Sequence, residues 1–179
     1  MSKAKKDRGS VELMADDQGA ERPDQTETAK VVMVQVAGKK IMDRDPYFLF
    51  STNQVEEVLS EIYKRPLPFS PEYLLGVCLW QQRLLPIIDL GRRCGFFADN
   101  ESGNSRYLVV RAVVPMEIGD NLQRCIMKVS SRIITAEIPD VCSPVALETA
   151  GVELSNIRGL FECDEKLMMV PDLTSILTC

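Results

Sequence analysis

The sequence contains no histidine among its 179 residues. Histidine most often serves as the general acid or base near neutral pH, and its imidazole is the commonest metal ligand in proteins. Its absence excludes Ser-His-Asp and Cys-His catalytic arrangements, a phosphohistidine relay and histidine-bound zinc. The sequence therefore points away from catalysis and toward a binding or scaffolding protein.

Long apolar runs are also missing. The longest apolar stretches, such as Leu84–Ile88 and Tyr107–Val110, are far shorter than the roughly 20 residues that cross a bilayer. The first 30 residues contain lysines but no apolar segment and no cleavage pattern of the secretory type. We therefore expect a cytoplasmic protein that makes no direct membrane insertion.

Basic residues are outnumbered by acidic ones. The chain has 21 Lys and Arg against 26 Asp and Glu, a net charge of −5. Because non-specific binding to nucleic acid depends on Lys and Arg that neutralise phosphates, we expect no nucleic-acid partner. Gly91 and Gly95 flank two arginines and a cysteine, but the residues around them lack the spacing of a phosphate-binding loop. We expect no cofactor, and protein or small-molecule partners are favoured.

The six cysteines form no C-x-x-C pair. A zinc site built from cysteine alone uses closely spaced ligand pairs, so no metal is expected. The wide spacing, together with the missing secretory signal, favours reduced thiols that fill the core. One enzymatic alternative is a nucleophilic Cys94, because the two arginines before it would lower the thiol pKa. Neither a general base nor an oxyanion device accompanies it.

Residues 1–29 differ from residues 30–179 in amino-acid composition and in apolar pattern. The first segment mixes charges with small polar residues and has few large apolar side chains, which predicts a disordered tail. From Lys30 onward, short apolar runs rich in β-branched residues alternate with turn residues, a pattern typical of strands. The expected strands lie within residues 31–38, 46–50, 55–63, 76–80, 83–89, 106–114, 122–129, 132–138, 158–163 and 166–170. Short helical turns are expected only at Ser70–Leu75 and after Asp89 and Asp172. The pattern predicts a mainly β protein, a barrel or a sandwich.

One segment repeats. Leu74–Leu90 aligns without a gap on Ile157–Leu173, with a glycine near the start of each copy and an aspartate near its end. In each copy a polar pair separates two apolar runs, which predicts a β-hairpin. The closing residues, Asp89 and Asp172, are expected to cap a following helical turn rather than to serve as catalytic acids. Two such hairpins predict two similar β units that bury a core between them.

A further set of residues runs in fixed order through Tyr47–Phe96. It comprises an aromatic-led strand, Val-x-Glu-hydrophobic, two prolines before Gly-Val, and Pro-hydrophobic-hydrophobic-Asp-Leu followed by a glycine. Its members are Phe48, Val55, Glu57, Val58, Pro68, Pro71, Gly76, Val77, Pro86, Asp89, Leu90 and Gly95. With this set the chain resembles, from about Val31 to Leu177, the CheW-like domain. That domain is the adaptor that links bacterial chemoreceptors to the CheA histidine kinase.

The resemblance implies a fold, a function and partners. The implied fold is mainly β: two SH3-like five-stranded β-barrel subdomains around a shared core, with few short helices. The implied function is non-enzymatic coupling, in which one groove takes a receptor's cytoplasmic helical tip and another surface binds the kinase regulatory domain. The implied receptor-side residues are Thr52, Val55, Glu57, Val58, Gln81 and Leu84. Trp80 is either an aromatic anchor of that interface or a core residue.

Regular alternation of side chains predicts which residues share a face of the strand at residues 55–63. It places Val55 and Glu57 on one face of their strand and Val58 on the other. It also points Glu56 and Glu57 in opposite directions, so that the two carboxylates do not serve one ligand.

The chain departs from the family pattern in the first hairpin. Leu79-Trp80-Gln81-Gln82 stands where the family usually has Asn-Leu-Arg-Gly. Gln81 carries no charge, so an acidic partner loses a charge-assisted contact typically worth ~1.5–3 kcal/mol. Lys128 stands where the family commonly has an acid. These departures favour a divergent member, either with altered receptor recognition or acting in another motility or signalling pathway.

Overall fold

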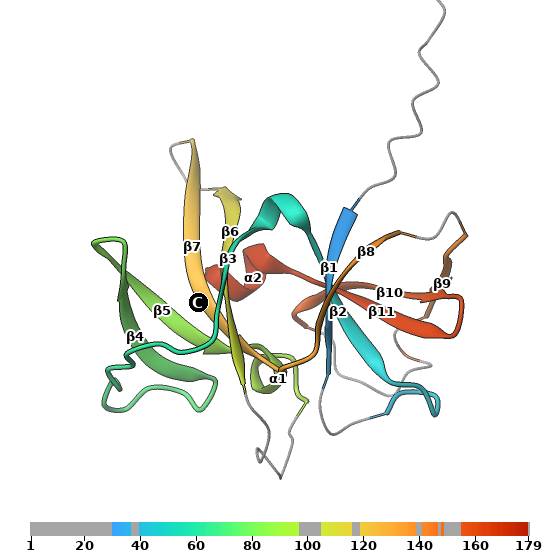
Figure 1. Cartoon of the computed structure of the whole chain (residues 1–179), viewed down its shortest axis with the longest axis horizontal. Coiled ribbons are helices and arrows are strands. Elements are labelled where there is room, and N and C mark those ends of the chain that lie inside the picture. The colour runs from blue at the N-terminus through green and yellow to red at the C-terminus, as the bar shows by residue number, and fades with distance from the viewer. Residues whose placement is uncertain are drawn as a thin grey trace, which may run out of the picture.

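The structure, a computed structural model, describes residues 30–36, 40–96, 105–115, 119–138, 141–146, 148 and 155–178. Strands dominate these residues, which confirms the predicted mainly β class. The strands form two sheets that lie side by side, with two short helices between them (Figure 1). The predicted tail, residues 1–29, lies outside the described residues. None of the described helices is long and apolar enough to span a bilayer.

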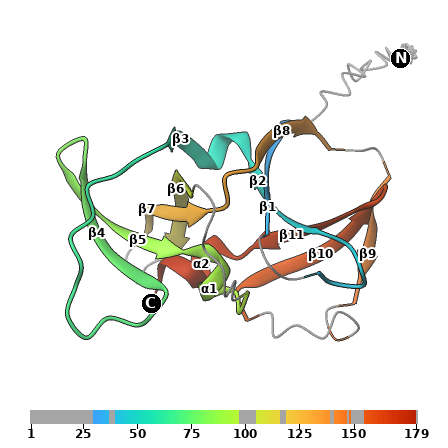
Figure 2. The same cartoon turned by 60° about the horizontal axis from the view of Figure 1, so that its bottom comes forward.

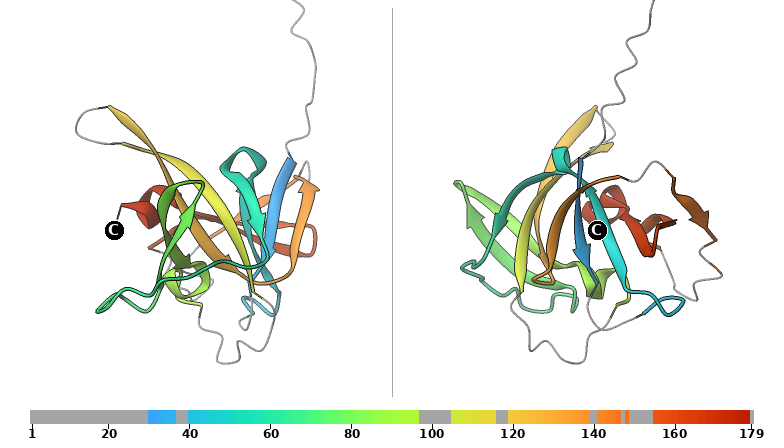
Figure 3. Two further views of the ribbon diagram at one scale, coloured as in Figure 1. Left: turned by 60° about the vertical axis from the view of Figure 1, so that its left-hand side comes forward. Right: turned by 45° about the vertical axis from the view of Figure 1, so that its right-hand side comes forward.

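The five-stranded sheet has the strand order β3-β6-β7-β5-β4. Its strands are β3 (Val55–Leu59), β4 (Leu74–Trp80), β5 (Arg83–Asp89), β6 (Arg106–Pro115) and β7 (Asp120–Val129). All neighbours are antiparallel except β5 and β7, which are parallel. The β6–β7 hairpin extends beyond the other strands of its sheet (Figure 3).

The six-stranded sheet has the order β8-β1-β2-β11-β10-β9. Its strands are β1 (Lys30–Gln35), β2 (Pro46–Ser51), β8 (Ile133–Glu137), β9 (Ser143–Val145), β10 (Ile157–Cys163) and β11 (Lys166–Pro171). Its parallel pair is β2 and β11. Strand β9 was not predicted, because three residues that include a proline carry too short an apolar pattern.

The chain enters one sheet twice. β1 and β2 belong to the six-stranded sheet, β3 to β7 build the five-stranded sheet, and the chain then returns with β8 to β11. A 3-10 helix, η1 (Thr52–Gln54), makes the first crossing directly after β2. The two units are therefore not consecutive halves of the sequence, because the five-stranded unit is inserted into the six-stranded one.

The expected shared core is the largest of three apolar clusters in the described residues. The largest lies between the sheets and includes Phe48, Phe50, Leu108, Met127 and Leu160. A smaller cluster of Cys78, Leu85, Ile87, Val109 and Ile126 lies on the opposite face of the five-stranded sheet, as the alternation of Leu108 and Val109 requires. A third cluster, Val31, Met33, Tyr47, Cys163 and Met168, belongs to the six-stranded sheet.

The repeated segment forms two equivalent hairpins, as predicted. β4 pairs with β5 and β10 with β11, and each ladder has an irregularity next to its glycine, Gly76 or Gly159. Asp89 Oδ1 accepts a hydrogen bond from Arg92 N at 3.0 Å and caps helix α1 (Leu90–Arg93). Asp172 accepts from the backbone N–H groups of the first turn of α2 (Leu173–Leu177). Both aspartates are caps.

The closed five-stranded barrels are not observed. One unit has six strands instead of five, and in the described residues neither sheet closes through a continuous hydrogen-bonded ladder. The five-stranded sheet does curl: an isolated bridge joins Arg65, in the β3–β4 connection, to Val77 of β4. Its edge strands also meet through side chains, because Trp80 of β4 bonds to Glu57 of β3.

Two local predictions are wrong. The segment Ser70–Leu75 forms a turn and the start of β4, not a helical turn, and the Ser70 hydroxyl donates to the carbonyls of Leu67 and Leu74. The expectation that all cysteines are reduced fails for Cys142 and Cys163, which form a disulfide. Pairing of β9 with β10 brings these distant cysteines together, with their Cα atoms 4.5 Å apart. Cys78, Cys94 and Cys125 are free and buried, as expected.

A polar junction ties the two units together where α1 and α2 lie next to each other (Figure 2). Asn156 is buried, and its Nδ2 donates to the carbonyl of Arg93, 2.9 Å away. The hydroxyl of Ser175 donates to Asn156 Oδ1. The Arg93 guanidinium stacks over the ring of Tyr73 at 4.5 Å. This junction fixes one unit relative to the other.

Candidate functional site

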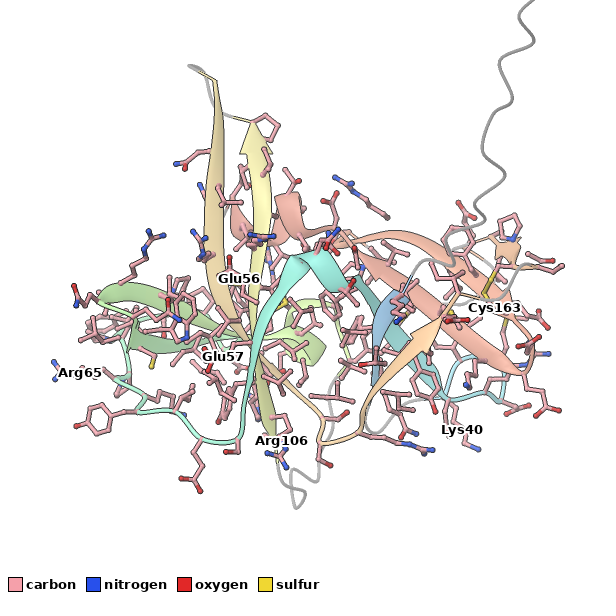
Figure 4. All side chains as sticks on the ribbon, turned by 45° about the horizontal axis from the view of Figure 1, so that its top comes forward. Lys40, Glu56, Glu57, Arg65, Arg106 and Cys163 are labelled. Carbon is pink, nitrogen blue, oxygen red and sulfur yellow. A yellow bond between two sulfur atoms is a disulfide. The ribbon has the colours of Figure 1, made fainter. Side chains whose placement is uncertain are left out.

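The seven residues predicted to form the partner interface lie on η1, β3 and the β4–β5 hairpin. β3 and β4 are the opposite edges of the five-stranded sheet, which its curl brings together. Figure 4 labels Glu56 and Glu57 on β3. The candidate residues are Thr52, Val55, Glu57, Val58, Trp80, Gln81 and Leu84. The structure divides them between the two faces of the sheet.

A β-bulge in β3 decides that division. Val55 lies opposite Val110 of β6, whereas Glu57, two residues on, lies opposite Val109. Because neighbouring residues of β6 point to opposite faces, Val55 and Glu57 point to opposite faces too. Val58 lies opposite Leu108, on the same face as Val55. The predicted pairing of Val55 with Glu57 is therefore wrong, since alternation does not hold across an inserted residue.

The same bulge turns Glu56 and Glu57 toward one side of the sheet. Glu56 bonds to Arg124, which shares its face with Ile126 of the smaller cluster. Glu57 bonds to Trp80, which packs against that same cluster. The expectation that the two carboxylates point in opposite directions is wrong, because both members of a bulge can lie on one side of the strand.

Trp80 packs as a partly buried residue of the smaller cluster, and its role as an interface anchor stays a prediction. Its ring is half-buried against the smaller cluster, and its indole Nε1–H donates to Glu57 Oε2 at 2.7 Å. Glu57 itself is exposed. The hydrogen bond holds the carboxylate in one place at the surface, because an indole N–H has a fixed direction once its ring is packed.

Glu56 is the centre of an ion-pair network that the sequence analysis missed. Arg124 donates to it twice, at 2.7 and 2.9 Å, and Arg111 once, at 3.5 Å. Arg111 Nε also donates to the carbonyl of Asn53 in η1, at 2.9 Å. The Arg124 hydrogen bond and the nearby positive charges lower the pKa of the Glu56 carboxyl, against the opposing effect of desolvation. The network ties the bulged residue of β3 to β6 and β7.

Apolar side chains lie exposed on the other face of these elements. Val58 is 50% exposed on β3, while Leu79 and Leu84, which face each other across the hairpin, are 70% and 65% exposed. Val55 is half-buried and packs against the large cluster. Large apolar side chains left in water on two neighbouring elements are typical of an interaction surface.

The remaining two candidates lie at turns. Thr52 is exposed at the start of η1, directly after Ser51, whose side chain caps that helix. Gln81 and Gln82 form the tip of the β4–β5 hairpin with φ of 43° and 63°. Both residues adopt the left-handed conformation that a two-residue hairpin turn requires and that glycine adopts most readily. The Gln81 side chain is exposed and carries no charge.

Cys94 does not fit the role of a nucleophile. The residue is 3% exposed, and burial raises the pKa of its thiol to about 12 against a small opposing effect of Arg93. At pH 8 only on the order of 1 in 10,000 of such thiols is ionised. We therefore expect iodoacetamide to label Cys94 in the native protein at least 100-fold more slowly than in urea-unfolded protein. Mass spectrometry of the Cys94 peptide measures this; equal rates in both states would reinstate a reactive thiol.

Comparison with known proteins supports the fold and the motif set. The model of the CheW-like domain matches residues 30–178. Among solved structures, the chain is similar to the scaffolding protein TtCheW from Thermoanaerobacter tengcongensis, with a TM-score of 0.59 and 19% identity. The match covers 82% of this chain and 90% of that one. Comparison with curated proteins gives no match. The family model spans all the described residues, and the chain therefore belongs to the CheW-like domain family.

Proposed function

We propose that this protein couples the cytoplasmic tips of chemoreceptors to a CheA-type histidine kinase and catalyses no reaction itself. Its family makes it a chemotaxis adaptor in general terms. The observation that carries the specific proposal is the Trp80–Glu57 hydrogen bond. It joins β3 to the β4–β5 hairpin, and these elements hold all the candidate residues except Thr52, which lies just before β3.

The chemistry of this surface suits a helical partner. Val58, Leu79 and Leu84 offer apolar contacts on one face of these elements, and Glu57, which points to the other face of the edge strand β3, offers a carboxylate of fixed position beside them. A helix that docks in such a place presents apolar side chains at i, i+3 and i+4, with polar groups at the border. Because Glu57 is exposed and its Oε2 is held by the half-buried Trp80, the carboxylate stays accessible to a docking partner.

A binding measurement tests the proposal. We expect a purified receptor cytoplasmic hairpin and a kinase regulatory domain each to bind the full chain with a Kd in the micromolar range. Replacing Glu57 with Gln removes the charge but keeps an oxygen for the indole, and should weaken receptor binding about 10-fold. Kinase binding should stay unchanged. Isothermal titration calorimetry measures both.

The matched control is Glu72→Gln, at an exposed position in the β3–β4 connection. It should alter neither affinity. No binding of either partner at high micromolar concentration would contradict the proposal. Equal losses from Glu57→Gln and Glu72→Gln would mean that charge acts through the general field of the protein and not through this site.

A second candidate function is favoured by the uncharged tip at Gln81 and Gln82. In it, the protein is a CheW-like interaction module of another motility or signalling pathway, with altered receptor recognition. Gln81→Arg distinguishes the two candidates in the same titration. If the receptor hairpin binds the wild-type chain weakly and Gln81→Arg at least 10 times more tightly, the second function is supported. Gln82→Gly serves as the control, because it relaxes the turn without adding charge.

A further inference from the structure

A pocket of about 330 Å³ lies between the two units and contains none of the seven candidate interface residues. Its walls come from η1, from the extended tip of the β6–β7 hairpin, and from β10, β11 and α2.

The pocket combines apolar walls with positive charge. Val113 and Leu122 face each other across the β6–β7 hairpin and are 56% and 44% exposed, although both are large apolar side chains. Arg111 lies on one side of the pocket and Arg158 on another. An occupant that buries the two apolar side chains must also satisfy these cations, so it has to be apolar and acidic at once.

The nearby acidic groups do not cancel this charge. Glu56 is shared between Arg111 and Arg124, and its shorter contacts are to Arg124. Arg158 pairs with Asp172 at 3.4 Å, with 62% of its side chain exposed. Among the described residues of these two networks, three arginines share two carboxylates, and two of the arginines, Arg111 and Arg158, line the pocket.

We propose that this pocket binds the chain's own residues 11–17, whose sequence is VELMADD. The segment has three apolar side chains, Val11, Leu13 and Met14, and three carboxylates, Glu12, Asp16 and Asp17. These are the two properties that the pocket requires. Two other charged runs precede Lys30: residues 3–8 are mainly basic and would be repelled by the arginines, and residues 21–27 are acidic but have no large apolar side chain.

The chain enters the described fold next to the pocket. Val31 pairs with Ser51, and Asn53, which lines the pocket, follows two residues later (Figure 1). The cross-strand distance from Val31 to Ser51 is about 5 Å, and the two residues from Ser51 to Asn53 add at most about 3.5 Å each. The point where the chain enters the fold therefore lies within about 12 Å of the pocket wall. Residues 18–29 can span up to about 40 Å, which is ample. Tethering at such a distance gives a millimolar effective concentration, so even a weak contact is populated.

Photo-crosslinking of the full chain tests the proposal. With p-benzoylphenylalanine in place of Met14, we expect intramolecular crosslinks to peptides that contain Val113, Leu122 or Leu173, identified by mass spectrometry of the monomer band. The control carries the same group in place of Ala4, in the basic run, and should give at least fivefold fewer crosslinks to these peptides. Equal patterns from the two positions would overturn the proposal. So would crosslinks that appear only between chains, since the occupant would then be a second copy.

Charge reversal gives an independent arm. Asp16→Lys with Asp17→Lys should reduce the Met14-position crosslinks at least fivefold, and adding Arg158→Glu should restore at least half of them. If neither the aspartate reversal nor the added Arg158 reversal alters the crosslink yield, the arginines do not select this segment.

Discussion

Gly76→Ala should lower the free energy of unfolding by about 3–5 kcal/mol, the largest effect expected of any single substitution considered for this chain. Gly76 has a φ of +134°, a conformation that residues with a Cβ rarely adopt. A Cβ built there would also lie 2.2 Å from the backbone carbonyl oxygen of Arg65. Strain and overlap therefore act together.

The overlap cannot be relieved by moving a side chain, because the Arg65 backbone is itself held. Arg65 N donates to the carbonyl of Val77 at 2.9 Å, and Val77 N donates to that of Arg65 at 2.8 Å. Alanine at position 76 forces this bridge apart and frees the β3–β4 connection. The hairpin carries Trp80, Gln81 and Leu84, so we expect the candidate interface to be lost with it.

The sequence repeat supplies a matched control, Gly159→Ala. Gly159 occupies the equivalent position of the β10–β11 hairpin, but the nearest atoms that a Cβ there would meet belong to the ring of Phe161, at 2.8 Å. A ring can turn away, so the expected loss is about 1 kcal/mol. Urea unfolding followed by the fluorescence of Trp80, the single tryptophan, measures both variants. Equal losses would show that the close approach to Arg65 is unimportant.

Glu56→Gln should cost about 1.5–3 kcal/mol of stability at pH 7, because it replaces the carboxylate that both Arg124 and Arg111 contact. The side chains of Glu56 and Arg124 are each 17% exposed, so water compensates poorly for the lost charge. The control is Glu61→Gln, at an exposed position shortly after β3, which should change stability by less than about 0.5 kcal/mol.

The same variant predicts a pH dependence. The pKa of Glu56 is lower in the folded protein than in the unfolded chain, so its contribution is complete above the unfolded value of about 4.3. That contribution is lost as the pH falls through the folded pKa. The stability gap between wild type and Glu56→Gln should therefore be constant from pH 7 to about 5.5 and shrink on further acidification. Urea titrations across this range measure it, and a gap that widens in acid would refute the assignment.

The sequence by itself determined the features that are local or periodic. Short apolar runs correctly predicted ten of the strands, because burial on one face of a strand repeats every second residue. The aligned segments Leu74–Leu90 and Ile157–Leu173 marked both hairpins, and their aspartates marked both caps, because capping is a contact between near neighbours. The motif set in Tyr47–Phe96 also identified the family correctly.

Only the tertiary structure decided the faces of β3, the partner of Glu56 and the disulfide. The bulge is set by pairing with β6, which lies about 50 residues further along the chain, so the strand's own sequence gives no sign of it. Arg124 and Cys163 reach Glu56 and Cys142 through sheet register, which depends on how all the strands pack at once. Contacts of this kind follow from the whole fold, and a pattern read along one strand cannot contain them.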